Sequence, residues 1–306
     1  MLMNKTFISC MLFACVAMPL CAQTTQSFSH MTIKSGFNQD VICEDASHVE
    51  ATMSQFSQLD LQGIDGSGFG FYTSDVQEEG AMCDASGEFK SSRTGATFKV
   101  DPTGLNALVL KGTKTTTVEG KQIIIPNSVT EGTLVFETPV SAKSVYVVGT
   151  SADGNTQIEV TVNYSDGTNI KDDITMYNWD NSDATSKAAA VVTGLGRIAS
   201  KKNWEGVAGH ISKSYNFNLF ESSVNTDNTK TINSVTIKQT NSGSSAAIFA
   251  VSTSDEKVSS GITGMTVAGK EVSKCYSLTG QELPAPQKGV VIVKYNDGAT
   301  RKVVIR

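Results

Sequence analysis

The segment 177–210 carries the residues best suited to binding a polar ligand. It begins with YNWDNSD and ends with GLGRIASKKNWEGVAGH, and it holds both tryptophans of the chain. An aromatic ring offers a face on which the C–H groups of a pyranose can stack, while polar side chains take its hydroxyl groups. We therefore predict a carbohydrate-binding edge in this segment. Its expected members are Trp179, Asp180, Arg197, Asn203, Trp204 and His210.

The same residue types have a purely structural alternative. A tryptophan in a β-sandwich often anchors a loop or the core, and Arg197 could pair with a nearby carboxylate. The two interpretations differ in one measurable property, because a stacking platform needs an exposed ring face and an anchor does not.

Catalytic and metal-binding patterns are missing from the sequence. His30, His48 and His210 stand in no nucleophile context, and no Gly-x-Ser-x-Gly elbow occurs. Most Asp residues lie in turns, so a glycosidase pair of carboxylates stays only as an alternative. No Cys-x-x-Cys or His–Cys cluster suggests zinc. IDGSG and SADGN resemble fragments of calcium loops without the full ligand pattern. We expect no enzyme activity and no cofactor, with a structural Ca²⁺ left open.

Residues 1–22 have the features of a secretory signal peptide. Lys5 precedes an apolar run from Phe7 to Ala22, and the small residue Ala22 ends a plausible cleavage site. The run is too short for a membrane anchor, so no membrane span is expected in the mature chain. A buried helix and a lipoprotein at Cys15 are the alternatives. The expected location is secreted, extracellular or on the outer cell surface.

Removal of the signal peptide leaves three of the six cysteines, namely Cys43, Cys83 and Cys275. Three thiols cannot form a disulfide framework. A Cys43–Cys83 pair stays open, and Cys275 is expected as a buried apolar residue. The formal charge is −5, with both signs mixed along the chain. No basic stripe suggests nucleic acid or an anionic lipid surface as a partner.

The main part of the chain is predicted to be all-β. Runs of β-branched and aromatic residues alternate with turns such as Asp65-Gly66, Asp166-Gly167 and Asn241-Ser242-Gly243. The expected strands are 69–73, 107–111, 122–126, 133–138, 144–150, 157–164, 189–194, 215–221, 234–240 and 246–252.

Three local patterns give more specific predictions. In 157–164 apolar and polar residues alternate, which indicates one face on a core and one in water. In 144–150 both faces are apolar, which indicates a central strand covered on both sides, and we expect it to form a hairpin with 157–164. The capping-box spacing of Ser47 and Glu50 predicts a helical turn or two within 47–59.

A polar stretch at 253–262 separates this part from a short terminal β-unit. Residues 275–306 resemble the C-terminal sorting domain of secreted bacteroidete proteins, although Val291 stands where the family usually has Tyr. The resemblance implies export by the type IX secretion system, whose machinery would be a partner. The matching positions are Tyr276, Leu278, Gly280 and Leu283, then Lys288, Gly289, Val290, Ile292 and Val293, and finally Lys302, Val303, Ile305 and Arg306. A last β-unit packed on the main domain is the alternative.

The main domain is similar to a galactose-binding-like jelly-roll domain of secreted bacteroidete proteins. The resemblance rests on residues 36–41, 144–168 and 248–252 and covers 34–252. It implies carbohydrate binding by analogy of fold, which is weak evidence for function. The expected fold is a jelly-roll-like β-sandwich followed by a small C-terminal antiparallel β-domain. The expected segments are the signal peptide 1–22, a lead-in 23–33, the sandwich 34–252, the linker 253–262 and the sorting domain 263–306.

Together these features predict a secreted or cell-surface, non-catalytic protein that binds a glycan or surface polysaccharide. A structural or adhesive protein without a small ligand is the second hypothesis, and a glycoside hydrolase is the third. An exposed aromatic shelf would favour glycan binding, whereas a flat polar sandwich face would favour the structural role.

Overall fold

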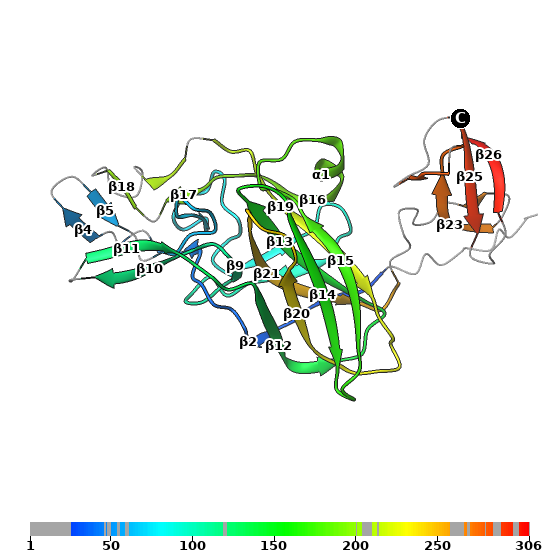
Figure 1. Ribbon diagram of the computed structural model, residues 1–306, viewed down its shortest axis with the longest axis horizontal. Coiled ribbons are helices and arrows are strands. Elements are labelled where there is room, and N and C mark those ends of the chain that lie inside the picture. Colours follow the sequence, from blue (N-terminus) through cyan, green and yellow to red (C-terminus); the bar gives the residue numbers. More distant parts are fainter. Residues whose placement is uncertain are drawn as a thin grey trace, which may run out of the picture.

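The computed structural model describes residues 26–45, 47, 50–53, 56–58, 61–118, 121–199, 201–203, 210–212, 214–257, 266–267, 270–278, 280–283, 289–295 and 300–305. Strands account for most of these residues, and the helix among them is the six-residue α1 (Ala184–Ala189). The predicted all-β, jelly-roll-like sandwich is confirmed (Figure 1). No helix in the described ranges is long and apolar enough to cross a membrane.

The first sheet, sheet A, is antiparallel and has β13 at its centre. Its strands are β1 (Phe28–His30), β9 (Leu108–Leu110), β13 (Ser144–Ala152), β16 (Ala190–Leu195), β19 (Phe217–Asn225) and β21 (Ser245–Ser254). Their order is β1-β21-β13-β19-β16, and β9 pairs with β21. Every residue of β13 is buried, which confirms the central strand predicted from its two apolar faces.

The second sheet, sheet B, has the order β15-β14-β20-β12-β2. Its strands are β2 (Ile33–Ser35), β12 (Glu131–Val140), β14 (Thr156–Tyr164), β15 (Asn169–Met176) and β20 (Ile232–Gln239). In β14, Ile158 and Val160 are fully buried and Gln157 is exposed, so the predicted alternation is confirmed.

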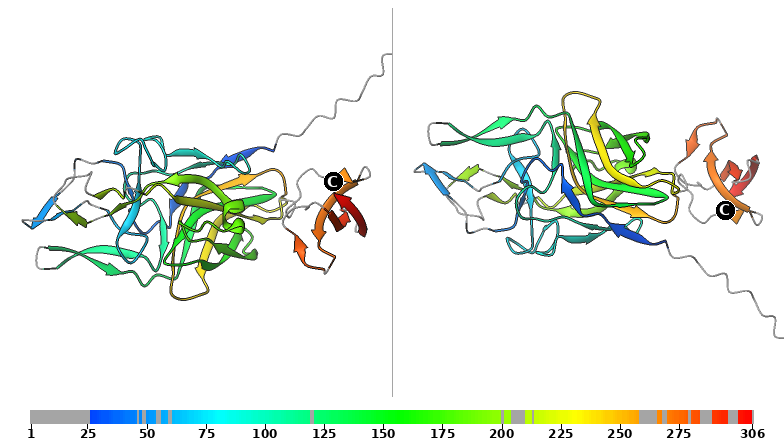
Figure 2. Two further views of the ribbon diagram at one scale, coloured as in Figure 1. Left: turned by 90° about the horizontal axis from the view of Figure 1, so that it is seen from above. Right: turned by 90° about the horizontal axis from the view of Figure 1, so that it is seen from below.

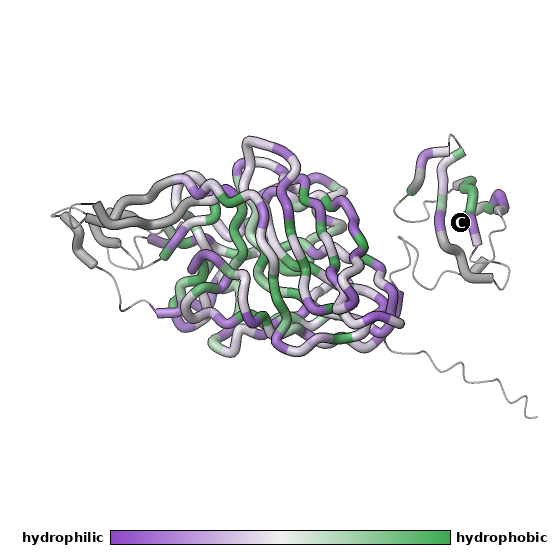
Figure 3. Tube along the Cα trace, turned by 60° about the horizontal axis from the view of Figure 1, so that its bottom comes forward, coloured by the Kyte–Doolittle hydropathy of each residue, from purple (hydrophilic) through white to green (hydrophobic). Residues whose placement is uncertain are grey.

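Two apolar layers hold these sheets in place. Val147 and Val251 of sheet A pack with Ile158 and Val235 of sheet B in the core between the sheets. The other face of sheet A is covered by residues 41–100, where Phe71 meets Phe249 at a centroid distance of 5.8 Å. The hydropathy-coloured trace in Figure 3 places the apolar segments along the strands of the interior. Of the two sheets of the sandwich, sheet B therefore keeps its outer face in water, as far as the described residues show.

The covering layer consists of short strands and turns. Its strands are β3 (Ile42–Cys43), β6 (Phe69–Tyr72), β7 (Glu88–Lys90), β8 (Thr97–Lys99) and β17 (Ile198–Ala199). Asn106 stabilises this layer through two hydrogen bonds. Its Nδ2 donates to Asp40 Oδ1 at 2.7 Å, and its Oδ1 accepts from Val41 N at 2.8 Å. Buried amides are stable only when they are bonded in this way.

The predicted hairpin between 144–150 and 157–164 is wrong. β13 pairs with β19 and β21, whereas β14 pairs with β15 and β20. The turn between them instead carries the chain from one sheet to the other, with Asp153 at φ 60° and Gly154 at φ 123°. A turn sequence specifies a reversal of direction and does not specify which sheet receives the next strand.

The predicted helical turns within 47–59 are also wrong. β4 (Glu50–Met53) and β5 (Phe56–Gln58) form an antiparallel pair, and β5 also pairs with β18 (Lys201–Asn203). The Ser47 hydroxyl donates to Asp45 Oδ2 at 2.8 Å. Pairing with a distant strand has overridden a weak local helix signal. A second hairpin, β10 (Thr113–Val118) with β11 (Lys121–Pro126), extends from the same end of the sandwich (Figure 2).

The C-terminal strands pair with one another within the described residues. They are β22 (Thr266–Val267), β23 (Lys270–Tyr276), β24 (Glu282–Leu283), β25 (Gly289–Tyr295) and β26 (Thr300–Ile305). Cys275, Val293 and Tyr295 form a small core of their own, which confirms Cys275 as a buried residue. The sandwich itself is longer than predicted, because it includes β1 and continues along β21 to Ser254.

Cys43 and Cys83 are both free and buried. Thr73 N donates to Cys43 O at 3.0 Å and Ser74 N donates to Cys83 O at 3.0 Å, from opposite edges of one strand. Two strand spacings amount to about 9.6 Å, beyond the Cα separation of roughly 4.4–6.8 Å that a disulfide spans. A Cys43–Cys83 bond does not form in this arrangement. Burial raises the pKa of each thiol to about 12.

Candidate ligand-binding site at one end of the sandwich

Trp179 is a core anchor and offers no platform. Its side chain is 3% exposed, and its ring lies edge-on to Phe71 and Phe217 at centroid distances of 5.8 and 5.3 Å. The backbone N–H of Trp179 donates to Ser151 O at 2.8 Å, which draws the segment after β15 onto sheet A. The prediction that Trp179 provides an exposed stacking surface is therefore wrong.

Arg197 is held between aromatic rings. Its guanidinium carbon lies 4.2 Å from the ring centroids of both Phe69 and Phe217 and 5.0 Å from that of Trp179. Nη1 lies 3.7 Å from Asp65 Oδ2, and the Arg197 side chain is 23% exposed. Nε is buried without a hydrogen-bond partner among the described residues. The geometry combines cation–π contact with an ion pair to a carboxylate that is distant in sequence.

The charges of three carboxylates act on this guanidinium. Burial lowers the pKa of Arg197, and the nearby charges of Asp65, Asp180 and Asp153 oppose that effect. Burial also raises the pKa of Asp65, against the Phe69 N–H, the Arg197 charge and the Ser67 N–H, which lower it. The local charge is net negative when all four groups are ionised, which favours neutral or positively charged ligands over anionic ones.

Four polar residues beside this cluster are exposed or, for Asn181, partly exposed, and we call Asp153, Asn155, Asp180 and Asn181 the end rim. Asp153 Oδ2 accepts from Gly66 N at 3.0 Å, which ties the β13–β14 turn to the turn before β6. Asn155 Oδ1 accepts from Asn178 N at 2.8 Å, and Asn178 Nδ2 donates to Asp180 Oδ1 at 2.7 Å. The end rim thus joins two loops into one surface.

A hydrogen-bonded network of buried hydroxyl groups stabilises the backbone of the end rim. Ser151 Oγ lies 2.6 Å from Thr156 Oγ1, which donates to Ser244 Oγ at 2.8 Å. Ser244 Oγ in turn donates to Asn155 O at 3.2 Å, and Ser245 Oγ donates to Ile64 O at 2.7 Å. Hydrogen-bonded networks of this kind hold loop backbones in one geometry.

Of the other predicted residues, His210 is described in full and lies in the core, away from this exposed cluster. His210 is 1% exposed and its Nδ1 lies 2.6 Å from Ala199 O, so Nδ1 carries the proton that the carbonyl accepts. Asn203 lies in β18 opposite Phe56, and its side chain lies outside the described residues, as does all of Trp204. The structure therefore brings together Trp179, Asp180 and Arg197 from the predicted set.

The sequence did not predict Asn181, which follows Asp180 in YNWDNSD, nor Asp65, Asp153 and Asn155. The last three residues lie in the segments IDGSG and SADGN, whose pattern indicates only turns or fragments of calcium loops. The two segments meet at the Gly66–Asp153 hydrogen bond. In the part of the chain that the structure describes, no group of three or more His, Cys, Asp or Glu is arranged to hold a metal ion.

The outer face of sheet B is mostly polar. Lys171 Nζ lies 2.7 Å from Glu159 Oε1, and Asn163 Nδ2 donates to Ser234 Oγ at 3.1 Å and to Thr236 Oγ1 at 3.0 Å. The residues that point outward from β12, β14, β15 and β20 are Glu131, Thr133, Val135, Gln157, Glu159, Thr161, Asn163, Asn169, Lys171, Asp173, Thr175, Ser234, Thr236 and Lys238, with no aromatic ring among them. These groups largely satisfy one another across the strands.

No family model matches this chain, and no curated protein does either. Among solved structures, the chain is similar to a family 29 carbohydrate-binding module at 11% sequence identity and a TM-score of 0.27. The match covers 58% of this chain and 96% of the module. A similarity at this TM-score carries no argument about the ligand.

Proposed function

We propose that this protein is a secreted, non-catalytic protein that binds a carbohydrate at the end rim. The observation that carries the proposal is the array of carboxylate and amide groups of Asp153, Asn155, Asp180 and Asn181, in which the charges of Asp153 and Asp180 also act on the half-buried Arg197. Carboxylates and amides bind neighbouring sugar hydroxyls through paired hydrogen bonds. Because the loops are already held by internal bonds, little entropy is lost when a ligand binds.

The two sheet faces are less suitable for a ligand. The outer face of sheet A is covered by residues 41–100, and the outward groups of sheet B bond to one another. The end rim has exposed polar groups beside partly buried aromatic surface, including Phe69. This combination supports a small or terminal saccharide unit as the ligand.

The arrangement of Asp65 supports binding rather than hydrolysis. Its Oδ1 accepts from Phe69 N at 2.8 Å and from Ser67 N at 3.0 Å, and its Oδ2 faces Arg197. A general acid must present a proton to the leaving group, whereas this carboxyl is engaged by the protein on both oxygens. We assign Asp65 a positioning role.

The proposal also includes export of the protein from the cell. The signal-peptide features of residues 1–22 and the resemblance of residues 275–306 to a sorting domain support a secreted or outer-surface location. The separate pairing of β22 to β26 is compatible with a module that secretion machinery recognises.

A glycan array probed with residues 23–306 tests the proposal. We expect retention of a subset of glycans and a loss of about tenfold or more in affinity for Asp180→Ala combined with Asn181→Ala, because hydrogen bonds worth about 1.5 kcal/mol are lost. Asp173→Ala is the matched control, since it removes an exposed carboxylate from the outer face of sheet B.

Three other outcomes would contradict either the end rim as the site or carbohydrate binding itself. Binding that survives the double variant contradicts the end rim, and binding lost only in Trp204→Ala moves the site to the segment that contains Trp204. If no glycan is retained at all, carbohydrate binding is wrong.

A structural or adhesive role is the second candidate, and the polar outer face of sheet B favours it. That face would contact a large surface through many weak polar interactions. Loss of surface adhesion in Asp173→Ala, with no glycan retained by the wild-type chain, would support this alternative.

A further inference from the structure

Glu221 is a buried carboxyl on the covered face of sheet A. It lies in β19 on the same side as Phe217 and Leu219, and its side chain is 1% exposed. An acidic side chain is rarely buried to this extent unless it is paired. Its neighbours therefore decide whether the buried position is stable.

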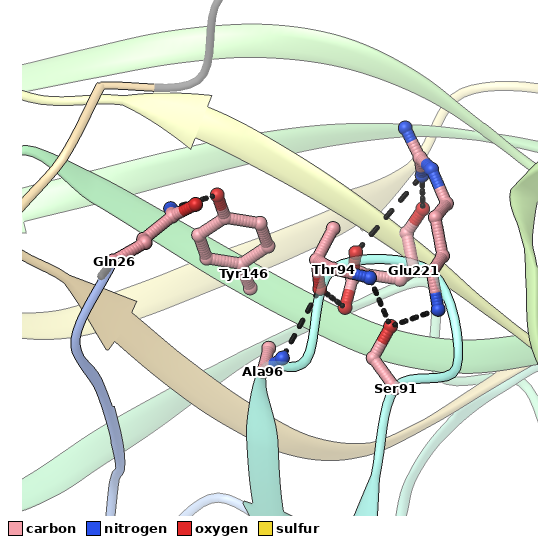
Figure 4. Close-up of polar contacts among 7 residues, drawn as sticks. Gln26, Ser91, Thr94, Ala96, Tyr146 and Glu221 are labelled. Carbon is pink, nitrogen blue, oxygen red and sulfur yellow. Dashed lines mark hydrogen bonds and ion pairs between the residues drawn. The ribbon is translucent and has the colours of Figure 1, made fainter. Parts of the chain in front are cut away.

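The pairing of Glu221 is incomplete. Thr94 Oγ1 donates to Glu221 Oε2 at 2.9 Å (Figure 4). Arg93 Nη1 lies 4.0 Å from Oε1 and donates to the Glu221 carbonyl at 3.4 Å. Oε1 has no hydrogen-bond partner within the described ranges. Because the Arg93 side chain is 45% exposed, water screens its attraction for the carboxylate.

Both partners come from the loop 91–96, which connects β7 to β8. Ser91 Oγ accepts from Arg93 N at 3.2 Å and from Thr94 N at 3.1 Å, and Thr94 Oγ1 accepts from Ala96 N at 3.2 Å. Ser92 N donates to Val191 O at 3.1 Å, which ties the loop to β16. The loop thus closes over Glu221 as one folded turn.

Few ionisable groups act on Glu221. Arg93 faces it from the loop and Tyr146 faces it from β13, where the phenol hydroxyl accepts from Gln26 Nε2 at 3.0 Å. Tyr177 interacts with Arg93 and with Asp183, the N-cap of α1. Burial raises the pKa of Glu221, and the Thr94 and Ser91 hydroxyls and the Arg93 charge offset only part of this effect.

We propose that the loop 91–96 is a proton-linked clamp, closed over β19 while Glu221 is neutral and loosened when Glu221 loses its proton. A neutral carboxyl keeps the Thr94 hydrogen bond without the cost of a buried charge. A carboxyl that binds its proton more tightly in the closed form favours closure at low pH. The stabilisation of the closed loop by the neutral carboxyl is complete below the ordinary pKa of 4.5. It is lost as the pH rises through the raised pKa of Glu221.

Hydrogen exchange of the 91–96 amides, corrected for intrinsic rates and measured from about pH 4 to about pH 8, tests the clamp. The opening equilibrium of the wild-type loop should rise by up to about tenfold per pH unit between the ordinary and the raised pKa, and then level off. Glu221→Gln should keep the loop protected at every pH. Glu88→Gln is the control, because Glu88 is an exposed carboxylate of the same hairpin that pairs with Lys99.

Flat protection in the wild type, or an unchanged pH slope in Glu221→Gln, would overturn the clamp. If Glu221→Gln fails to fold, a titration of the wild-type chain still tests the proposal. NMR titration of the Glu221 carboxyl should give a midpoint above 4.5, and a midpoint at or below that value contradicts the proposal.

Discussion

At the scale of single residues, Arg197 holds the end of the sandwich together. It joins Phe69 of β6 to Phe217 of β19 and neutralises the buried Asp65. A planar guanidinium can stack on two rings while it pairs with a carboxylate, which an ammonium cannot do. The residue that sequence analysis assigned to ligand binding therefore has a positioning role for the whole end rim.

Substitution of Arg197 should destabilise the fold in a graded way. Arg197→Lys loses the stacking and should lower the free energy of unfolding by about 1–2 kcal/mol. Arg197→Ala leaves Asp65 buried without its ion pair and should cost about 3–5 kcal/mol. Urea unfolding measures both, with Lys171→Ala in the exposed pair with Glu159 as a control that stays close to wild type. No loss of stability in Arg197→Lys would contradict a role for stacking, and equal losses for the two Arg197 variants would contradict a contribution from the ion pair with Asp65.

At the scale of elements, Gly36 lets β2 approach β12. A Cβ at this position would lie 2.0 Å from Thr133 O, and Gly36 has a φ of 120°. Gly243, in the turn between β20 and β21, also has positive φ at 88°, but its Cβ would meet nothing within 4 Å. Substitution of Gly243 therefore tests backbone strain alone, whereas substitution of Gly36 tests backbone strain together with a steric clash.

We expect Gly243→Ala to cost about 1–2 kcal/mol from backbone strain alone. Gly36→Ala adds a clash with the neighbouring strand and should cost roughly 2–5 kcal/mol in total. Thermal and urea unfolding of both variants measures the difference. Similar losses at the two positions would mean that β2 moves away from β12 at little cost.

At the scale of the whole molecule, the C-terminal strands and the sandwich have separate cores. In the described ranges, β22 to β26 pair with one another, whereas β1 near the other end of the chain pairs with β21. A chain of residues 23–257 should therefore unfold cooperatively at nearly the same temperature as residues 23–306. A chain of residues 32–257 lacks β1 and should be less stable. A sandwich that aggregates or melts early without residues 258–306 would show that the two units depend on each other.

Much of this architecture was predictable from local patterns. The alternation in 157–164 and the two apolar faces of 144–150 assigned β14 and β13 correctly, because side-chain direction alternates along every strand. The terminal strands 289–295 and 300–305 form an antiparallel pair, as expected for a small C-terminal antiparallel β-domain. These signals depend only on neighbouring residues, so a single sequence contains them.

Tertiary structure alone decided which strands pair and which rings are covered. No local signal states that the turn after β13 crosses to the other sheet, or that residues 56–58 pair with β18. Trp179 is buried because Phe71 and Phe217 cover it, and Arg197 finds its partner in Asp65, more than a hundred positions away. Such contacts arise from the packing of distant segments, whose relative positions only the complete fold determines.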